Sequence, residues 1–62
     1  MKWTRKPVFD YHEYHAERGE WSFCIDRKGR GWKLRGWKNG VFRKYEEGSS
    51  LKGLKAVAEE IK

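Results

Sequence analysis

Cationic and aromatic side chains that could bind a polyanion are concentrated in the middle of this chain. The stretch GRGWKLRGWKNG, residues 29–40, places Trp32 and Trp37 among arginines and lysines and contains no acid. Such cations neutralise phosphates, arginine forks recognise guanine in the major groove, and an exposed indole stacks on bases. The candidate nucleic-acid-binding residues are therefore Arg30, Lys33, Arg35, Trp37, Lys38, Arg43 and Lys44.

The distribution of charge supports this choice. The formal net charge is +6, and residues 21–45 hold eight Lys or Arg side chains against one acid. The segments on either side are close to neutral. A localised basic surface attracts polyanions better than the same charge spread evenly over a protein.

Metal binding and catalysis by a cysteine nucleophile are not favoured by the positions of the histidines and the cysteine. His12, His15 and Cys24 are metal-ligand types, but histidines three residues apart on a strand face opposite ways. A structural zinc site also takes four protein ligands. Cys24 lies in the middle of an expected strand, with no helix N-terminus to lower its pKa. We therefore expect no metal, no cofactor and no enzymatic activity.

The elements that must position these residues follow from periodicity. WSFCID and GWKLRGW alternate as half-buried strands, and VFRKYEE is a further strand after the turn signal Asn39-Gly40. Leu51, Leu54, Val57, Ala58 and Ile61 recur at helical spacing, and Ser49 or Ser50 would cap that helix. The segment PVFDYHEYH is expected as a fourth strand, with a helix over 10–18 as the alternative.

The sequence therefore predicts one small α+β domain over residues 1–62. It is a three- or four-stranded antiparallel meander with one C-terminal helix packed on one face. Alternation directs Trp21, Phe23, Ile25, Trp32 and Leu34 toward the helix, and Ser22, Cys24, Lys33, Arg35 and Trp37 toward the other face. Trp32 is then expected in the core, and Trp37 outside it with the cations.

Size and cysteine content bear on the setting of the protein. A single cysteine, Cys24, allows no internal disulfide, whereas small secreted domains normally contain several. No apolar run has the length of a membrane span, and no signal peptide is recognisable at the N-terminus. We expect an intracellular, cytoplasmic protein without membrane contact, either a monomer or a weak dimer.

The order of three antiparallel strands and one helix resembles two kinds of DNA-binding domain, the plant ethylene-response-factor type and the arm-site-binding type of phage integrases. The similar stretch runs from Gly19 to Ile61 and includes W-x-F-x-I from Trp21 to Ile25, the glycine turn before Trp32, and LKAVAEEI. The resemblance implies that the sheet face opposite the helix contacts the major groove, here through Arg30, Lys33, Arg35, Trp37 and Arg43. The connection YEEGSS is longer than in that family, and the family's alanine pair early in the helix is absent. The layout is also similar to that of small phage-encoded proteins of unknown role.

Two functional hypotheses follow. The first is a small non-enzymatic module that binds duplex DNA through the basic, Trp-containing sheet face. The alternative is an inhibitor or adaptor, for instance phage-encoded, that docks the same face on an acidic host protein. Trp, Tyr and Arg anchor both kinds of interface, so composition alone does not separate them.

Overall fold

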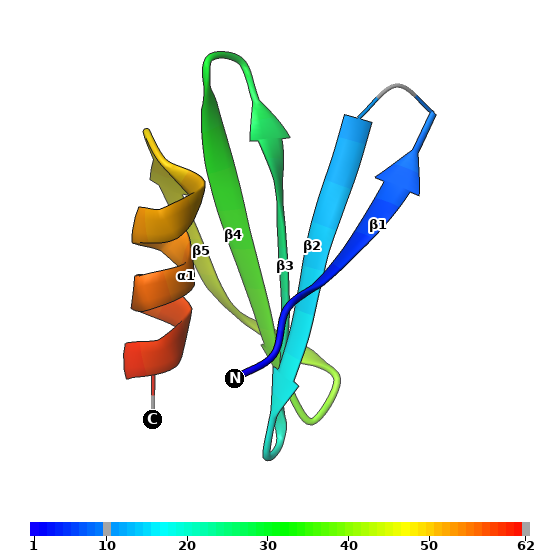
Figure 1. Cartoon of the computed structure of the whole chain (residues 1–62). Coiled ribbons are helices and arrows are strands. Elements are labelled where there is room, and N and C mark those ends of the chain that lie inside the picture. Colours follow the sequence, from blue (N-terminus) through cyan, green and yellow to red (C-terminus); the bar gives the residue numbers. More distant parts are fainter. Residues whose placement is uncertain (10, 62) are drawn as a thin grey trace.

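The computed structural model describes residues 1–9 and 11–61 and contains one antiparallel sheet with a C-terminal helix (Figure 1). The five strands are β1 (Thr4–Val8), β2 (Tyr11–Arg18), β3 (Trp21–Lys28), β4 (Gly31–Lys38) and β5 (Val41–Gly48). They pair in the order β1-β2-β3-β4-β5, and the helix α1 spans Leu51–Glu60. The α+β class, the antiparallel meander and the C-terminal helix are confirmed. The expectation of three or four strands is wrong, because there are five.

The additional strand arises because the segment expected as one strand contributes to two, β1 and β2, which pair as a hairpin. β1 and β2 pair from Thr4 opposite His15 to Val8 opposite Tyr11. The alternative of a helix over 10–18 is also wrong for Tyr11–Arg18; Asp10 lies outside the described residues. The chain leaves β1 through Phe9, which has a φ of 53° and a fully exposed side chain. A left-handed phenylalanine is uncommon, so the conformation of Phe9 is not one that its residue type predicts.

The other turns follow their local sequence. Asn39 and Gly40 both have positive φ, at 52° and 80°, which is the conformation of a two-residue type I′ hairpin turn. The backbone N–H of Asn39 also donates to the carbonyl oxygen of Glu20 at 2.9 Å, which links the β4–β5 turn to the β2–β3 turn. Ser50 caps α1 as expected, since its Oγ accepts from the backbone N–H of Gly53 at 3.0 Å.

The core lies between α1 and the face of the sheet at β3 and β4. Its buried members are Phe23, Ile25, Leu34, Leu54 and Ala58, as the alternation predicted for the strands and the helical spacing for α1. Partly buried side chains surround it: Trp3, Tyr14, Trp21, Trp32, Leu51, Val57 and Ile61. Figure 1 shows α1 at the β4–β5 side of the sheet, with β1 at the far side.

In residues 1–9 and 11–61 there is no helix with the length and apolar character needed to cross a membrane.

Candidate functional site

The sheet face opposite α1, here called the open face, is formed by alternate residues of neighbouring strands. Cys24 of β3 lies opposite Arg35 of β4, and Asp26 lies opposite Lys33. Ser22 lies opposite Trp37 in the same ladder. The facing predicted from alternation is therefore confirmed for Ser22, Cys24, Lys33, Arg35 and Trp37.

An aromatic pair occupies the β4–β5 border of the open face. The Trp37 and Phe42 rings pack edge to face, with centroids 5.8 Å apart and an interplanar angle of 70°. The Arg35 guanidinium carbon lies 5.5 Å from the Trp37 ring centroid, in the range of a cation–π contact. Phe42 is 51% exposed and Trp37 is half-buried. The border therefore presents apolar ring surface beside a cation.

Trp32 lies on the other side of the same strand. It packs edge to face with Tyr14 at 5.9 Å, and the Arg27 guanidinium carbon lies 4.8 Å from its ring centroid. The opposite facing of the two tryptophans is confirmed. Trp32 is only half-buried, however, and borders the core instead of filling it. Leu34 and Ile25 occupy the fully buried positions beside it.

Two of the candidate cations are partly neutralised by a buried acid. Asp26 is only 7% exposed, and its Oδ2 lies 3.7 Å from Lys33 Nζ and 3.8 Å from Arg35 Nη2. A carboxylate removed from water needs such compensating charge, since burial of an unpaired ion is costly. Lys33 and Arg35 therefore help to stabilise Asp26, and the three groups together contribute one net positive charge to the open face.

A second ion pair lies beside this group, because Glu47 of β5 is directly opposite Lys33 of β4. Lys28 Nζ donates to Glu47 Oε2 at 2.6 Å, and the Tyr45 hydroxyl donates to the same oxygen at 2.8 Å. These two hydrogen bonds hold the pKa of Glu47 below its ordinary value, with that from Lys28 the larger cause. The open face therefore carries both positive and negative side chains. Its net positive charge is smaller than the excess of cations in residues 21–45 suggested.

The remaining candidates are dispersed. Arg30 lies in the turn between β3 and β4, and Arg43 lies on β5 at the irregularity opposite Gly36 and Trp37; both are exposed. Lys44 lies opposite Gly36 on the helix side, where a Cβ on Gly36 would meet both Lys44 Cβ and the Phe23 ring. Lys38 is also on the helix side and lines a shallow hollow with Trp21 and Ile61. The structure thus brings together Lys33, Arg35 and Trp37, with Arg43 nearby on β5, and separates Lys38 and Lys44 from them.

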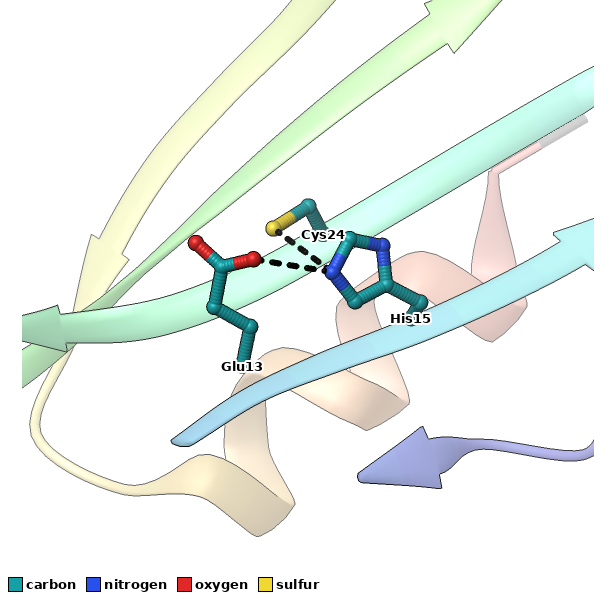
Figure 2. Close-up of side chains that lie close together, drawn as sticks. All are labelled: Glu13, His15 and Cys24. Atoms are coloured by element: carbon teal, nitrogen blue, oxygen red, sulfur yellow. Dashed lines mark hydrogen bonds and ion pairs between the residues drawn. The ribbon is translucent and has the colours of Figure 1, made fainter. Parts of the chain in front are cut away.

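A polar cluster that the sequence did not reveal adjoins Arg35 on the open face (Figure 2). His15 Nε2 lies 3.0 Å from Glu13 Oε1 and 3.8 Å from Cys24 Sγ. The Arg35 Nη2 donates to the same sulfur at 3.4 Å. The metal-ligand types considered from the sequence were His12, His15 and Cys24. The signal that was missed is Glu13, which shares a face with His15 because the two are two residues apart on one strand.

The geometry of this cluster does not fit nucleophilic catalysis. In a Cys–His–acid arrangement one ring nitrogen accepts the thiol proton while the other donates to the acid. Here a single nitrogen, Nε2, faces both Glu13 and Cys24, as Figure 2 shows. A carboxylate only accepts hydrogen bonds, so Nε2 carries the proton that it donates to Glu13. A protonated Nε2 has no free lone pair with which to accept the thiol proton. Burial also raises the pKa of Cys24, against the lowering effect of Arg35. The thiol is therefore protonated and unreactive at neutral pH.

The same three side chains are the strongest candidate for a metal site in the described part of the chain. The Glu13, His15 and Cys24 ligand atoms lie within 4.8 Å of one another. Three protein ligands are typical of an open site, not of a structural zinc site, which takes four. The permanently charged Arg35 guanidinium, in contact with the sulfur, opposes a divalent cation at this point. The contacts are better explained as a hydrogen-bonded cover over Cys24, which is 3% exposed.

No protein-family model, curated protein or solved structure matches this chain significantly. The open face and its β4–β5 border are therefore the basis for assigning a function.

Proposed function

We propose that the protein is a small, non-enzymatic module that binds duplex DNA through the β4–β5 border of its open face. The observation that carries this proposal is the pairing of the exposed Phe42 with the half-buried Trp37, with the Arg35 guanidinium against the Trp37 ring. Arginine binds phosphates and guanine edges, and flat rings pack on sugars and bases. A twisted antiparallel ribbon also has the dimensions to enter the major groove.

The charge on β4, on β5 and in the β3–β4 turn supports the same proposal, with fewer phosphate contacts than the sequence alone suggests. Within residues 1–9 and 11–61, Arg30 and Arg43 are exposed and make no ion pair. Together with the single net charge of Lys33, Arg35 and Asp26, they provide about three effective phosphate contacts. Because log K falls by about 0.9 per contact for each unit of log salt, the expected slope is about −3. Five contacts, from Arg30, Lys33, Arg35, Lys38 and Arg43, would give a slope of about −4 to −5. The smaller expected value reflects both the charge of Asp26 and the position of Lys38 on the helix side.

A second candidate function is an inhibitor or adaptor that docks on an acidic protein, and a specific observation favours it. Val41, Phe42 and Tyr45 are all about half exposed on β5, a strand at the edge of the sheet. Exposed apolar residues flanked by cations are typical of protein interfaces as well as of DNA-binding surfaces. Both candidates place the module inside the cell, which the single unpaired Cys24 supports.

The test is a titration of short duplexes with the wild type and two variants, followed by fluorescence anisotropy at several salt concentrations. Arg43→Gln should reduce the salt slope by about one unit, because it removes one phosphate contact. Lys52→Gln on α1, the matched control, should leave the slope unchanged. Tighter binding to single strands than to duplexes would contradict duplex binding and indicate that the protein recognises unpaired bases. Only weak binding, with Kd of about 10⁻⁴–10⁻⁶ M for every duplex near physiological salt, would reject DNA and favour the acidic protein.

A further inference from the structure

The two edges of the sheet differ in how they are protected. β1 and β5 are the terminal strands of the five-stranded order. β1 contains Pro7, which lacks a backbone N–H, and the adjacent cations Arg5 and Lys6, and both features discourage pairing with another copy of the same strand. β5 contains no proline. Among the described backbone hydrogen bonds outside the helix and the sheet ladders, none involves β5.

The charges along β5 are arranged so that the strand complements itself. From Arg43 to Glu47 the residues are Arg, Lys, Tyr, Glu and Glu, with two cations before Tyr45 and two anions after it. If two copies pair in the antiparallel sense with Tyr45 opposite Tyr45, Arg43 of each copy lies opposite Glu47 of the other. Lys44 then lies opposite Glu46. Opposite-charge residues placed directly across a sheet stabilise the pair, and like charges destabilise it.

This charge pattern also selects the register. A shift that centres the pair on Lys44 places lysine opposite lysine, and one that centres it on Glu46 places glutamate opposite glutamate. In the regular part of β5, from Lys44 to Glu47, the side chains already face suitable directions. Lys44 and Glu46 share the helix side, where Nζ lies 3.3 Å from Oε1, whereas Arg43 lies at the irregularity. Tyr45 and Glu47 share the open face, where the hydroxyl donates to the carboxylate. These exposed contacts within one copy leave the carboxylates able to accept further hydrogen bonds from a second copy.

We propose that β5 pairs antiparallel with β5 of a second copy of this chain, centred on Tyr45, so that the two sheets become one. The exposed Val41, Phe42 and Tyr45 side chains lie along this seam. A two-fold axis perpendicular to a continuous sheet keeps corresponding faces on the same side. The dimer therefore shows both open faces, with both Trp37–Phe42 pairs, toward the same partner. The seam does not depend on DNA binding. In a DNA-binding dimer it would present two symmetry-related Trp37–Phe42 pairs, while Arg43 would face Glu47 of the second copy instead of a phosphate.

The test measures mass by sedimentation equilibrium at low salt without nucleic acid, over protein concentrations from micromolar to millimolar. The wild type should approach twice its 7.5 kDa chain mass as concentration rises. The variant R43E/K44E has four like charges around Tyr45, as does E46K/E47R, so each should remain monomeric. An equimolar mixture of the two variants should form a heterodimer, and the variant R43E/K44E/E46K/E47R should recover the homodimer.

Controls separate a lost interface from a lost fold. Circular dichroism melts should show that each variant is folded. Formation of the heterodimer is further evidence, because it requires R43E/K44E and E46K/E47R both to be folded. R5E/K6E, on the other edge, should dimerise as the wild type does. The inference is overturned if the wild type is monomeric at millimolar concentration, if either half-variant dimerises as strongly as the wild type, or if the mixture stays monomeric. Failure of these mass measurements leaves the duplex titrations unaffected, so the two proposals are tested separately.

Discussion

The Phe23 ring of β3 lies against Gly36, the residue directly opposite it on β4. A Cβ on Gly36 would come within 3.2 Å of two Phe23 ring carbons and of Lys44 Cβ. Phe23 is only 2% exposed and stacks parallel to Trp21, with ring centroids 5.5 Å apart. A side chain at position 36 would therefore crowd this aromatic ring where it packs into the core against the sheet.

The first prediction follows from this contact. Gly36→Ala should lower the free energy of unfolding by about 1–3 kcal/mol, because overpacking a tight site displaces its neighbours. Chemical denaturation monitored by fluorescence measures the change. Lys52→Ala on the exposed side of α1 is the control and should stay within about 0.5 kcal/mol of wild type. An alanine that is tolerated at position 36 would mean that Phe23 can move aside without loss.

The second prediction concerns how α1 is held on the sheet. Leu54 is 2% exposed and belongs to the buried core cluster, so Leu54→Ala should destabilise the protein by about 2–5 kcal/mol. A helix of this length is not stable alone in water, so its circular dichroism signal should be lost together with the tertiary signal. Separate transitions for helix and sheet would contradict this dependence.

The third prediction distinguishes the two tryptophans of β4. Trp32→Ala removes contacts with Tyr14 and the edge of the core, and should lower the melting temperature more than Trp37→Ala. Trp37→Ala should instead weaken duplex binding while leaving the salt slope unchanged, because ring packing is not a charge interaction. Melting curves and anisotropy titrations on the same samples provide both measurements. The reverse ranking in stability would show that Trp37 is the structural indole.

The fourth prediction concerns pH and Cys24. Burial raises the folded-state pKa of this thiol above its ordinary value of 9.0, so the native state retains the proton at a pH where the unfolded state releases it. The stabilisation is fully present below about pH 9 and is lost as pH rises through the folded-state pKa. Denaturation of wild type and Cys24→Ala between pH 7 and 10.5 should therefore show a steeper alkaline decline for wild type. Equal slopes would mean that the buried thiol titrates normally.

The reactivity of the same thiol provides an independent check. At pH 7.5 a thiol-specific disulfide reagent should label native Cys24 much more slowly than the denatured chain, because the sulfur is buried and protonated. Rapid native labelling would require the polar cover formed by His15 and Arg35 to open readily.

Local periodicity in the sequence was sufficient to predict much of this fold. Alternation predicted that Phe23 and Cys24 lie on opposite faces of the sheet. Asn39-Gly40 predicted a hairpin turn, and a serine was expected at the N-cap of α1. These features depend on side-chain spacing and backbone preference over a few residues, and both can be read along the chain. The same alternation also places Lys38 on the helix side, away from Lys33 and Arg35, so this separation could have been predicted from the sequence.

Only the tertiary structure shows which charged and polar side chains contact one another. Asp26 neutralises part of the charge of Lys33 and Arg35, and Cys24 meets His15 and Arg35, because strand register brings these residues together from separate strands. The irregularity opposite Gly36 and Trp37 shifts the facing of β5 and turns Lys44 toward the helix side. The hairpin of β1 and β2 reverses at Phe9, a residue type that rarely adopts positive φ. Register, bulges and a strained turn depend on packing between distant residues, which a one-dimensional pattern does not contain.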